Sequence, residues 1–130
     1  MNLYVADTHA LFWYLVRSSR LGAAALRAFE EGANAQATIL IPAIVLAEFY
    51  FMNAKLGRPI DFGDAFRRIE SGRQYVLVDD AGTDTLDFDA NASVTEMHDR
   101  MIVGLALRRG ASPISGDRQI TQSGLVPMMW

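Results

Sequence analysis

The chain has 130 residues, of which 51% are hydrophobic and 21% are charged, and it contains no cysteine. We expect one soluble globular domain over residues 1–130, and the composition excludes disulfides and thiolate metal sites. The formal net charge of −3 argues against a nucleic-acid partner, but Lys55 is the only lysine among 12 basic residues. Arginine suits bidentate contact with phosphate, so charge alone does not decide the question.

Neither a targeting segment nor a membrane span is expected. Asp7 and His9 interrupt the apolar run at the start of the chain, and no basic segment precedes it, so a signal peptide is not predicted. The longest apolar stretch, residues 39–52, contains Pro42 and Glu48 and is too short to cross a bilayer. Together with the lack of cysteine, these features predict a cytoplasmic protein that does not contact membranes.

The apolar pattern predicts strands that alternate with helices. Leu3–Ala6 is a nearly continuous apolar run, typical of a strand covered on both faces, and Asp7 ends it. Further strands are expected at 37–41, 75–78, 111–115 and 125–129, and helices at 8–16, 22–32, 42–57, 61–72 and 93–110, with a weaker helix over 82–91 and a short helical turn around Ile120. This order predicts an α/β fold, a three-layer α/β/α sandwich with a five-stranded parallel sheet.

Glu48 is the most unusual polar residue of the chain. In the segment Ile44–Met52 every other residue is apolar or aromatic, which predicts a buried helix. A buried carboxylate needs a partner. Two interpretations remain open: an ion pair with Lys55 or with an arginine from elsewhere, or a metal ligand. Taken alone, this segment favours the ion pair.

Three aspartates also have simple structural explanations. Asp7 and Asp117 follow predicted strands, where aspartate often caps a helix or forms a turn, and Asp99 lies in the first turn of its helix, where it complements the helix dipole. Ser93 and Glu96 have the spacing of a capping box, which predicts a structural role for Glu96. Each of these residues is therefore weak evidence for a site when it is considered alone.

Considered together, the three aspartates and Glu48 are expected to meet. Asp7 and Asp117 follow the carboxyl ends of parallel strands, the edge at which α/β sheets bind ligands, and the helices that carry Glu48 and Asp99 can reach this edge. Several carboxylates in one place repel one another unless a cation neutralises them. Oxygen ligands without cysteine select Mg²⁺ or Mn²⁺, which can activate water for attack on a phosphodiester. The residues predict metal-assisted hydrolysis.

Four segments follow one another in an order that resembles the PIN-domain ribonucleases of the VapC toxin type. They are Asp7–Tyr14, the helix that contains Ala47–Glu48, His98–Ala106 and Ile114–Ile120. The resemblance covers essentially the whole chain, including a final strand that ends at Trp130. It implies the PIN fold, whose sheet has five parallel strands.

The resemblance also implies a function and a set of site residues. Asp7, Glu48, Asp99 and Asp117 would bind one or two Mg²⁺ or Mn²⁺ ions that cleave RNA, and the hydroxyl groups of Thr8 and Ser115 would support them. A cognate VapB-like antitoxin would inhibit the enzyme, and the chain would form a homodimer. The aromatic residues of 11–14 and the pair Phe62 and Phe66 are candidate contact surfaces, unless they belong to the core.

The chain departs from the family pattern at two points. Many members have Asp-Pro where this chain has Glu96-Met97, and many have a basic or larger residue where Gly116 stands. Both histidines adjoin acids, but we interpret His98 as part of the helix start and not as a general base, because a metal-bound hydroxide already supplies the nucleophile.

Two other functions remain open. One is a PIN-fold module that binds partners without catalysis. The other is an Mg²⁺-dependent phosphoacceptor domain resembling response-regulator receivers. That chemistry needs a lysine at the end of a late strand, and Lys55 lies in a predicted helix, so this alternative is disfavoured.

Overall fold

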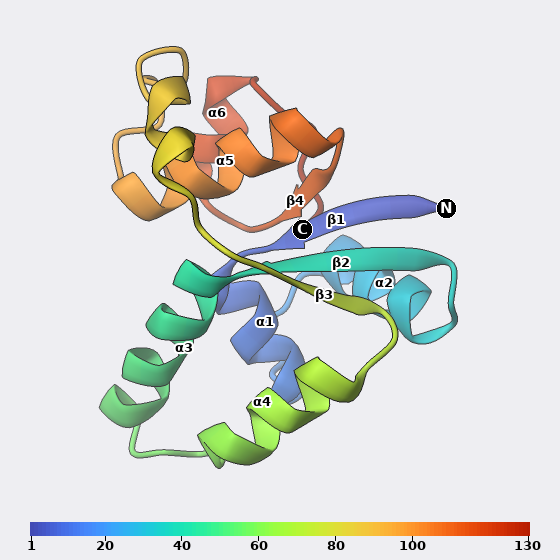
Figure 1. Cartoon of the computed structure of the whole chain (residues 1–130). Coiled ribbons are helices and arrows are strands. Elements are labelled where there is room, and N and C mark those ends of the chain that lie inside the picture. Colours follow the sequence, from blue (N-terminus) through green and yellow to red (C-terminus); the bar gives the residue numbers. More distant parts are fainter.

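A computed structural model describes all 130 residues and confirms an α/β fold with a parallel sheet (Figure 1). The strands are β1 (Asn2–Ala6), β2 (Ala37–Pro42), β3 (Tyr75–Val78) and β4 (Ser112–Ile114), in the order β3-β2-β1-β4. The helices are α1 (Thr8–Leu15), α2 (Ala23–Ala33), α3 (Ala43–Lys55), α4 (Phe62–Ser71), the 3₁₀ helix η1 (Gly82–Asp87), α5 (Met97–Arg109) and α6 (Arg118–Ser123). None of the helices combines the length and the apolar character that a membrane crossing requires.

The sheet has four strands, so the prediction of a fifth strand over 125–129 is wrong. Met129 forms only an isolated parallel bridge with Ile114, in which its N–H donates to Pro113 O at 2.9 Å and its carbonyl accepts from Ser115 N at 3.1 Å. Pro113 in β4 and Pro127 beside the bridge have no N–H to donate. Because each proline removes a donor from the ladder, the pairing does not extend beyond this bridge.

The direction of the chain across the sheet reverses at β1. From β1 to β2 to β3 the strands are added on one side, whereas β4 returns to the other side of β1. Connections between parallel strands are right-handed, so the two directions place their helices on opposite faces of the sheet. Figure 1 shows α1, α3 and α4 on one face and α5 and α6 on the other. The carboxyl ends of β1 and β4 therefore border a crevice, the usual ligand position in such sheets.

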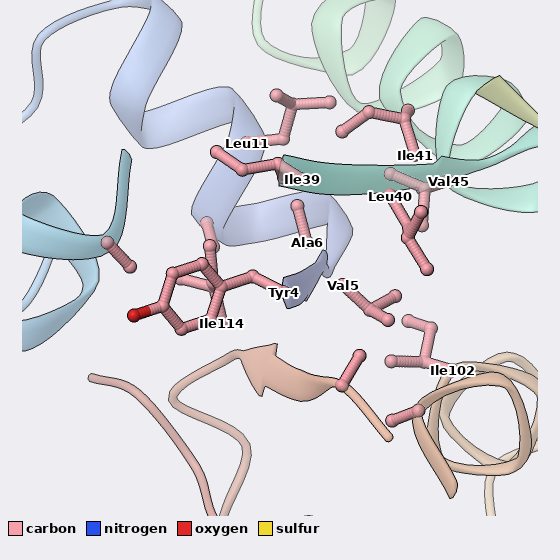
Figure 2. Packing of buried hydrophobic residues seen from close by; sticks show 14 of the residues in the cluster. Tyr4, Val5, Ala6, Leu11, Ile39, Leu40, Ile41, Val45, Ile102 and Ile114 are labelled. Carbon is pink, nitrogen blue, oxygen red and sulfur yellow. The ribbon is translucent and has the colours of Figure 1, made fainter. Parts of the chain in front are cut away.

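One core of 28 buried hydrophobic residues holds both helical layers to the sheet. Successive side chains of a strand point to opposite faces. Figure 2 shows this alternation in β2, where Ile41 points to the face that carries Leu11 of α1, whereas Leu40 points with Val5 of β1 toward Ile102 of α5. Because both faces of β1 are covered, Asp7, which follows this strand, is buried.

Helix α3 is buried on one side only, whereas the sequence predicts burial around most of its surface. Val45, Phe49 and Asn53 recur every four residues and face the interior. In contrast, Tyr50 and Phe51 are 41% and 71% exposed. Ile44, Leu46 and Met52 are partly buried against the core, and the ring of Tyr50 contacts that of Phe62 in α4, with centroids 5.3 Å apart. Phe51 is thus the most exposed large apolar side chain of α3.

The aromatic residues of α1 divide between the core and the surface. Leu11 and Phe12 are buried, whereas Trp13 and Tyr14 are partly exposed. The ring of Tyr14 stacks on that of Phe29 in α2, with centroids 4.3 Å apart. Residues 11–14 were predicted to form a contact surface, but only Trp13 and Tyr14 are accessible for such a contact.

The one-sided burial of α3 predicts unequal effects of removing two neighbouring rings. Phe49→Ala should lower the free energy of unfolding by about 3 to 5 kcal/mol, because Phe49 is fully buried and the substitution leaves a cavity. Phe51→Ala, on the exposed face of the same helix, should change it by less than about 0.5 kcal/mol. Urea denaturation followed by circular dichroism measures both values. Equal losses would contradict the packing described here.

Candidate functional site

A cavity of about 410 Å³ opens at the carboxyl ends of β1 and β4. The residues that line it come from five parts of the chain: Asp7, Thr8, His9, Trp13, Glu48, Glu96, Asp99, Ile102, Gly116, Asp117 and Trp130. The structure therefore brings together all four carboxylates singled out in the sequence. Thr8 lines the same cavity. Ser115 is buried and directly precedes Gly116, which also lines the cavity.

Asp7 is both the N-cap of α1 and a buried carboxylate of the cavity. Its Oδ1 accepts a hydrogen bond from Ala10 N at 2.8 Å, and only 7% of the residue is exposed. Burial raises the pKa of Asp7, and the charge of Asp117 raises it further, while hydrogen bonds with Ser115 and Ala10 N act in the opposite direction. The helix-cap and site interpretations of Asp7 are thus compatible.

Asp117 has the same double position at the end of β4. It is the N-cap of α6, where its Oδ1 accepts hydrogen bonds from Gln119 N at 2.8 Å and Ile120 N at 3.1 Å. The buried hydroxyl oxygen of Ser115 accepts from Asp117 N at 3.1 Å. Since the side chain of Ser115 also interacts with the carboxyl group of Asp7 and lowers its pKa, one buried residue lies beside both strand-end aspartates.

Glu48 is held by two residues that sequence analysis did not pair with it. Thr8 Oγ1 donates to Glu48 Oε1 at 2.8 Å, and His98 Nδ1 lies 3.1 Å from Glu48 Oε2. The expected ion pair with Lys55 does not form, because Lys55 is exposed at the end of α3 and does not line the cavity. His98 is thus part of the site, which its position next to Asp99 in the sequence suggested but did not establish.

Glu96 precedes α5 as its N-cap, so the structural role predicted for it is confirmed, whereas the predicted capping box with Ser93 is wrong. As the N-cap, Glu96 accepts a hydrogen bond from Asp99 N through Oε2 at 2.8 Å. Its other oxygen lies 2.9 Å from His98 Nδ1. The side chain of Arg100 donates to the carbonyl of Val94, which holds the preceding residues in turns and keeps the helix from starting earlier. Glu96 is a fifth carboxylate of the cavity that the sequence did not reveal.

The negative charges of four other carboxylates of the cavity act on Asp99. Burial raises its pKa to about 7, helped by the negative charges of Asp117, Glu96, Asp7 and Glu48, in that order. No lysine or arginine is among the residues that line the cavity. The carboxylates are therefore crowded without a fixed cation beside them, which is the situation that a bound divalent ion relieves.

The donor set fits a hard divalent cation by its chemistry. Five carboxylates and no thiolate are the oxygen ligands that Mg²⁺ and Mn²⁺ select. In the side-chain arrangement of this structure, no three of the His, Asp and Glu residues converge closely enough to hold an ion. Several of these oxygens are engaged elsewhere: Glu48 and Glu96 with His98, and Asp7 and Asp117 with helix N-termini.

Comparison with known protein families identifies the family of the chain. The sequence profile described as "PIN domain" matches residues 4–124. The chain belongs to the PIN-domain family. This confirms the family predicted from the four motifs. It also disfavours the phosphoacceptor alternative, as does the position of Lys55 away from the cavity.

Solved structures share the fold of this PIN domain at low sequence identity. The crystal structure of VapBC2 from Rickettsia felis bound to a DNA fragment from their promoter matches with a TM-score of 0.70 and 15% identity, over 97% of this chain and 96% of that one. The structure of PAE2754 from Pyrobaculum aerophilum matches with a TM-score of 0.63 and 17% identity, over 98% and 83%. A comparison with curated protein sequences finds no match.

The raised pKa of Asp99 predicts how the stability of the metal-free PIN domain depends on pH. The folded protein holds this proton more tightly than the unfolded chain, so the resulting stabilisation is complete below pH of about 4 and is lost as the pH rises through about 7. In EDTA, the melting temperature of the wild type should therefore fall more steeply toward pH 8 than that of Asp99→Asn. At that pH we expect the variant to melt about 3 °C higher or more.

Differential scanning fluorimetry across this pH range measures the effect. Asp89→Asn is a matched control, because Asp89 is exposed and outside the cavity. It should retain the slope of the wild type. Parallel slopes for the wild type and Asp99→Asn would contradict the electrostatic assignment.

Proposed function

We propose that this PIN domain is a metal-dependent endoribonuclease of the VapC type, which hydrolyses RNA phosphodiester bonds. The observation that supports it most is the meeting of Asp7, Glu48, Asp99 and Asp117 in one cavity, although they come from four separate elements. Their mutual repulsion opposes folding unless a cation offsets it. Such a cost is typical of functional sites.

Asp7, Glu48, Asp99 and Asp117 are the residues that would hold Mg²⁺ or Mn²⁺. When bound, the ion supplies charge stabilisation at the phosphate and lowers the pKa of water. The protein contributes orientation. Thr8 and His98 contact separate oxygens of Glu48, and Ser115 lies beside both strand-end aspartates.

Asp99 has a distinct place in this mechanism. With its pKa raised to about 7, it must lose a proton before it can act as a ligand near neutral pH. The other carboxylates that raise this pKa would be neutralised by the same ion. Binding of the ion and release of the Asp99 proton are therefore coupled.

We further propose that a VapB-like antitoxin inhibits the enzyme and that the chain forms a homodimer. The fold similarity to VapBC2 of Rickettsia felis supports the first proposal. The exposed Tyr50 and Phe51 on α3 support an additional protein contact, since exposed apolar surface of this kind commonly marks an interface.

Replacement of Asp7 tests the nuclease directly. With Mg²⁺ or Mn²⁺, antitoxin-free wild type should cleave some members of a set of structured and single-stranded RNAs, and EDTA should abolish the reaction. Asp7→Asn should reduce the rate by more than about a hundredfold, because loss of a residue that only orients a ligand already costs about 10- to 100-fold. Gel analysis of the products measures both rates, with Asp89→Asn as the matched control. Undiminished cleavage by Asp7→Asn would refute the proposed site.

A PIN-fold binding module without catalysis is the second candidate. One observation favours it: no three potential ligands converge on a metal position in this structure. Isothermal titration with Mn²⁺, combined with the RNA cleavage assay, separates the candidates. Binding of the ion without cleavage of any RNA by an antitoxin-free preparation would support the binding module.

The hydroxyl group of Thr8 provides a test of how Glu48 is oriented. Thr8→Val keeps the shape of the side chain but removes the hydrogen bond to Glu48 Oε1. We expect the affinity for Mn²⁺ to fall about 10- to 100-fold, as measured by calorimetry. Thr38→Val is a matched control, because Thr38 lies in β2 outside the cavity and contacts Met1. Equal affinities for the wild type and Thr8→Val would show that Glu48 does not depend on this bond.

A further inference from the structure

One wall of the acidic cavity is aromatic. Trp13 and Trp130 both line it, together with the carboxylates. Trp13 is partly exposed, and its ring contacts the buried ring of Phe12 in an edge-to-face arrangement, with centroids 5.5 Å apart. Trp130 is 40% exposed. Large rings open to solvent beside a site of uncompensated charge need a function other than core packing.

The position of Trp130 depends on two glycines. A Cβ atom at Gly116 would lie 2.7 Å from Trp130 Cε2, and one at Gly22 would lie 2.9 Å from Trp130 Cδ1. Both distances are shorter than real Cβ contacts, so the indole occupies the space that a side chain at either position would need. The backbone of Trp130 is also held, because its carbonyl accepts a hydrogen bond from Ala24 N at 3.3 Å.

Gly116 connects this ring to the acids. It lies between Ser115 and Asp117, so the indole packs on the same short loop that presents Asp117 to the cavity. Because Gly116 has no side chain, the ring of Trp130 can pack against this loop and form an aromatic wall of the cavity next to Asp117.

We propose that Trp13 and Trp130 form a stacking subsite for an unpaired nucleobase of single-stranded RNA, beside the phosphodiester at the carboxylates. The inference rests on the proposed function for the identity of that phosphodiester. Aromatic side chains bind exposed bases by stacking in many RNA-binding proteins, largely without regard to sequence. The cavity, at about 410 Å³, falls within the range of pockets for small ligands of about 300 to 1,000 Å³.

The surroundings of Trp13 favour a nucleotide over an apolar protein segment. The guanidinium carbon of Arg20 lies 5.1 Å from the centroid of the Trp13 ring. Arginine beside an aromatic ring can contact both a base and the adjacent phosphate. The cavity itself contains several carboxylates, which would be desolvated at a cost by an apolar partner. A base within a duplex is stacked on both faces, so the substrate must offer an unpaired one.

The composition of the chain provides a direct readout. Trp13 and Trp130 are its only two tryptophans and both line this cavity, so its tryptophan fluorescence reports on ligands bound there, although Trp13 also borders a second pocket with Tyr14 and Leu26. We would use Asp7→Asn protein with Mg²⁺ and a labelled single-stranded RNA 12-mer of mixed sequence, with the same RNA as a duplex for comparison. The single strand should bind more tightly and should quench the tryptophan fluorescence.

Substitutions in the same background then test each ring. Trp130→Ala and Trp13→Ala should each weaken binding of the single strand about 5- to 150-fold, measured by fluorescence anisotropy. Trp130→Phe should recover most of the affinity, because phenylalanine can still stack. Phe51→Ala, which removes an exposed ring outside the cavity, is the matched control and should bind as tightly as the parent. Circular dichroism and thermal melting identify any variant that fails to fold. If an alanine variant does not fold, the affinity of Trp130→Phe and the quenching of tryptophan fluorescence test the subsite instead.

Three results would overturn the stacking subsite: no binding of the single strand, binding without quenching, or full affinity in both alanine variants. The last would assign the aromatic wall to protein contacts. Failure of the subsite and failure of the nuclease are distinguishable. RNA cleavage by the wild type and equally by both alanine variants refutes only the subsite, whereas tryptophan-dependent RNA binding without any cleavage refutes only the nuclease.

Discussion

The pairing of β1 with β4 is the contact on which the candidate site depends. Val5 lies opposite Pro113 and Ala6 opposite Ile114, and Asp7 N then donates to Ile114 O at 3.1 Å. This register places the residues after both strands side by side, which is how Ser115 comes to contact two aspartates. A shift of one residue would turn the side chains that follow each strand toward the opposite face. The relative positions of Asp7 and Asp117 are therefore fixed by the backbone hydrogen bonds between β1 and β4.

Local structure and proposed chemistry use the same side chains. Asp7, Asp117 and Glu96 each satisfy the N-terminal N–H groups of a helix while facing the cavity. A cap stabilises a helix end by about 1 kcal/mol, which offsets part of the cost of crowding negative charge. It also fixes the backbone that carries each carboxylate. A carboxylate that caps a helix can thus also belong to the site, so the capping role of these residues does not argue against a functional one.

The fold was predictable because each element carries its own pattern, whereas several features of the site depend on contacts between elements. The apolar run before Asp7 and the isolated Glu48 identified the right helices and strands. The partner of Glu48 could not be identified in this way, because His98 lies on another helix and its distance depends on how α3 and α5 pack. Glu96 has the structural role that was predicted, but as the N-cap of α5, because the residues before it form turns and not the start of the helix.

Two other errors have simple physical causes. An apolar sequence in α3 indicates only that the helix avoids water in part, and it does not reveal that Phe51 is largely exposed. The expected fifth strand had a suitable composition, but Pro113 and Pro127 limit its hydrogen bonds. Both errors come from treating a segment as independent of what packs beside it.

The single bridge at Met129 has a consequence for motion. Two backbone hydrogen bonds join residues 125–129 to β4 and its following loop, whereas β1 pairs with β2 over Asn2–Val5 and with β4 over Tyr4–Ala6. Segments with few such bonds open at a lower free energy than the central strands, through local unfolding that leaves the rest of the fold intact. Trp130, on one side of the cavity, therefore follows a segment held to the sheet by an isolated bridge, whereas Asp7, on the other side, follows a strand that is paired on both sides. The two sides of the cavity thus differ in how many backbone hydrogen bonds hold the segments that form them.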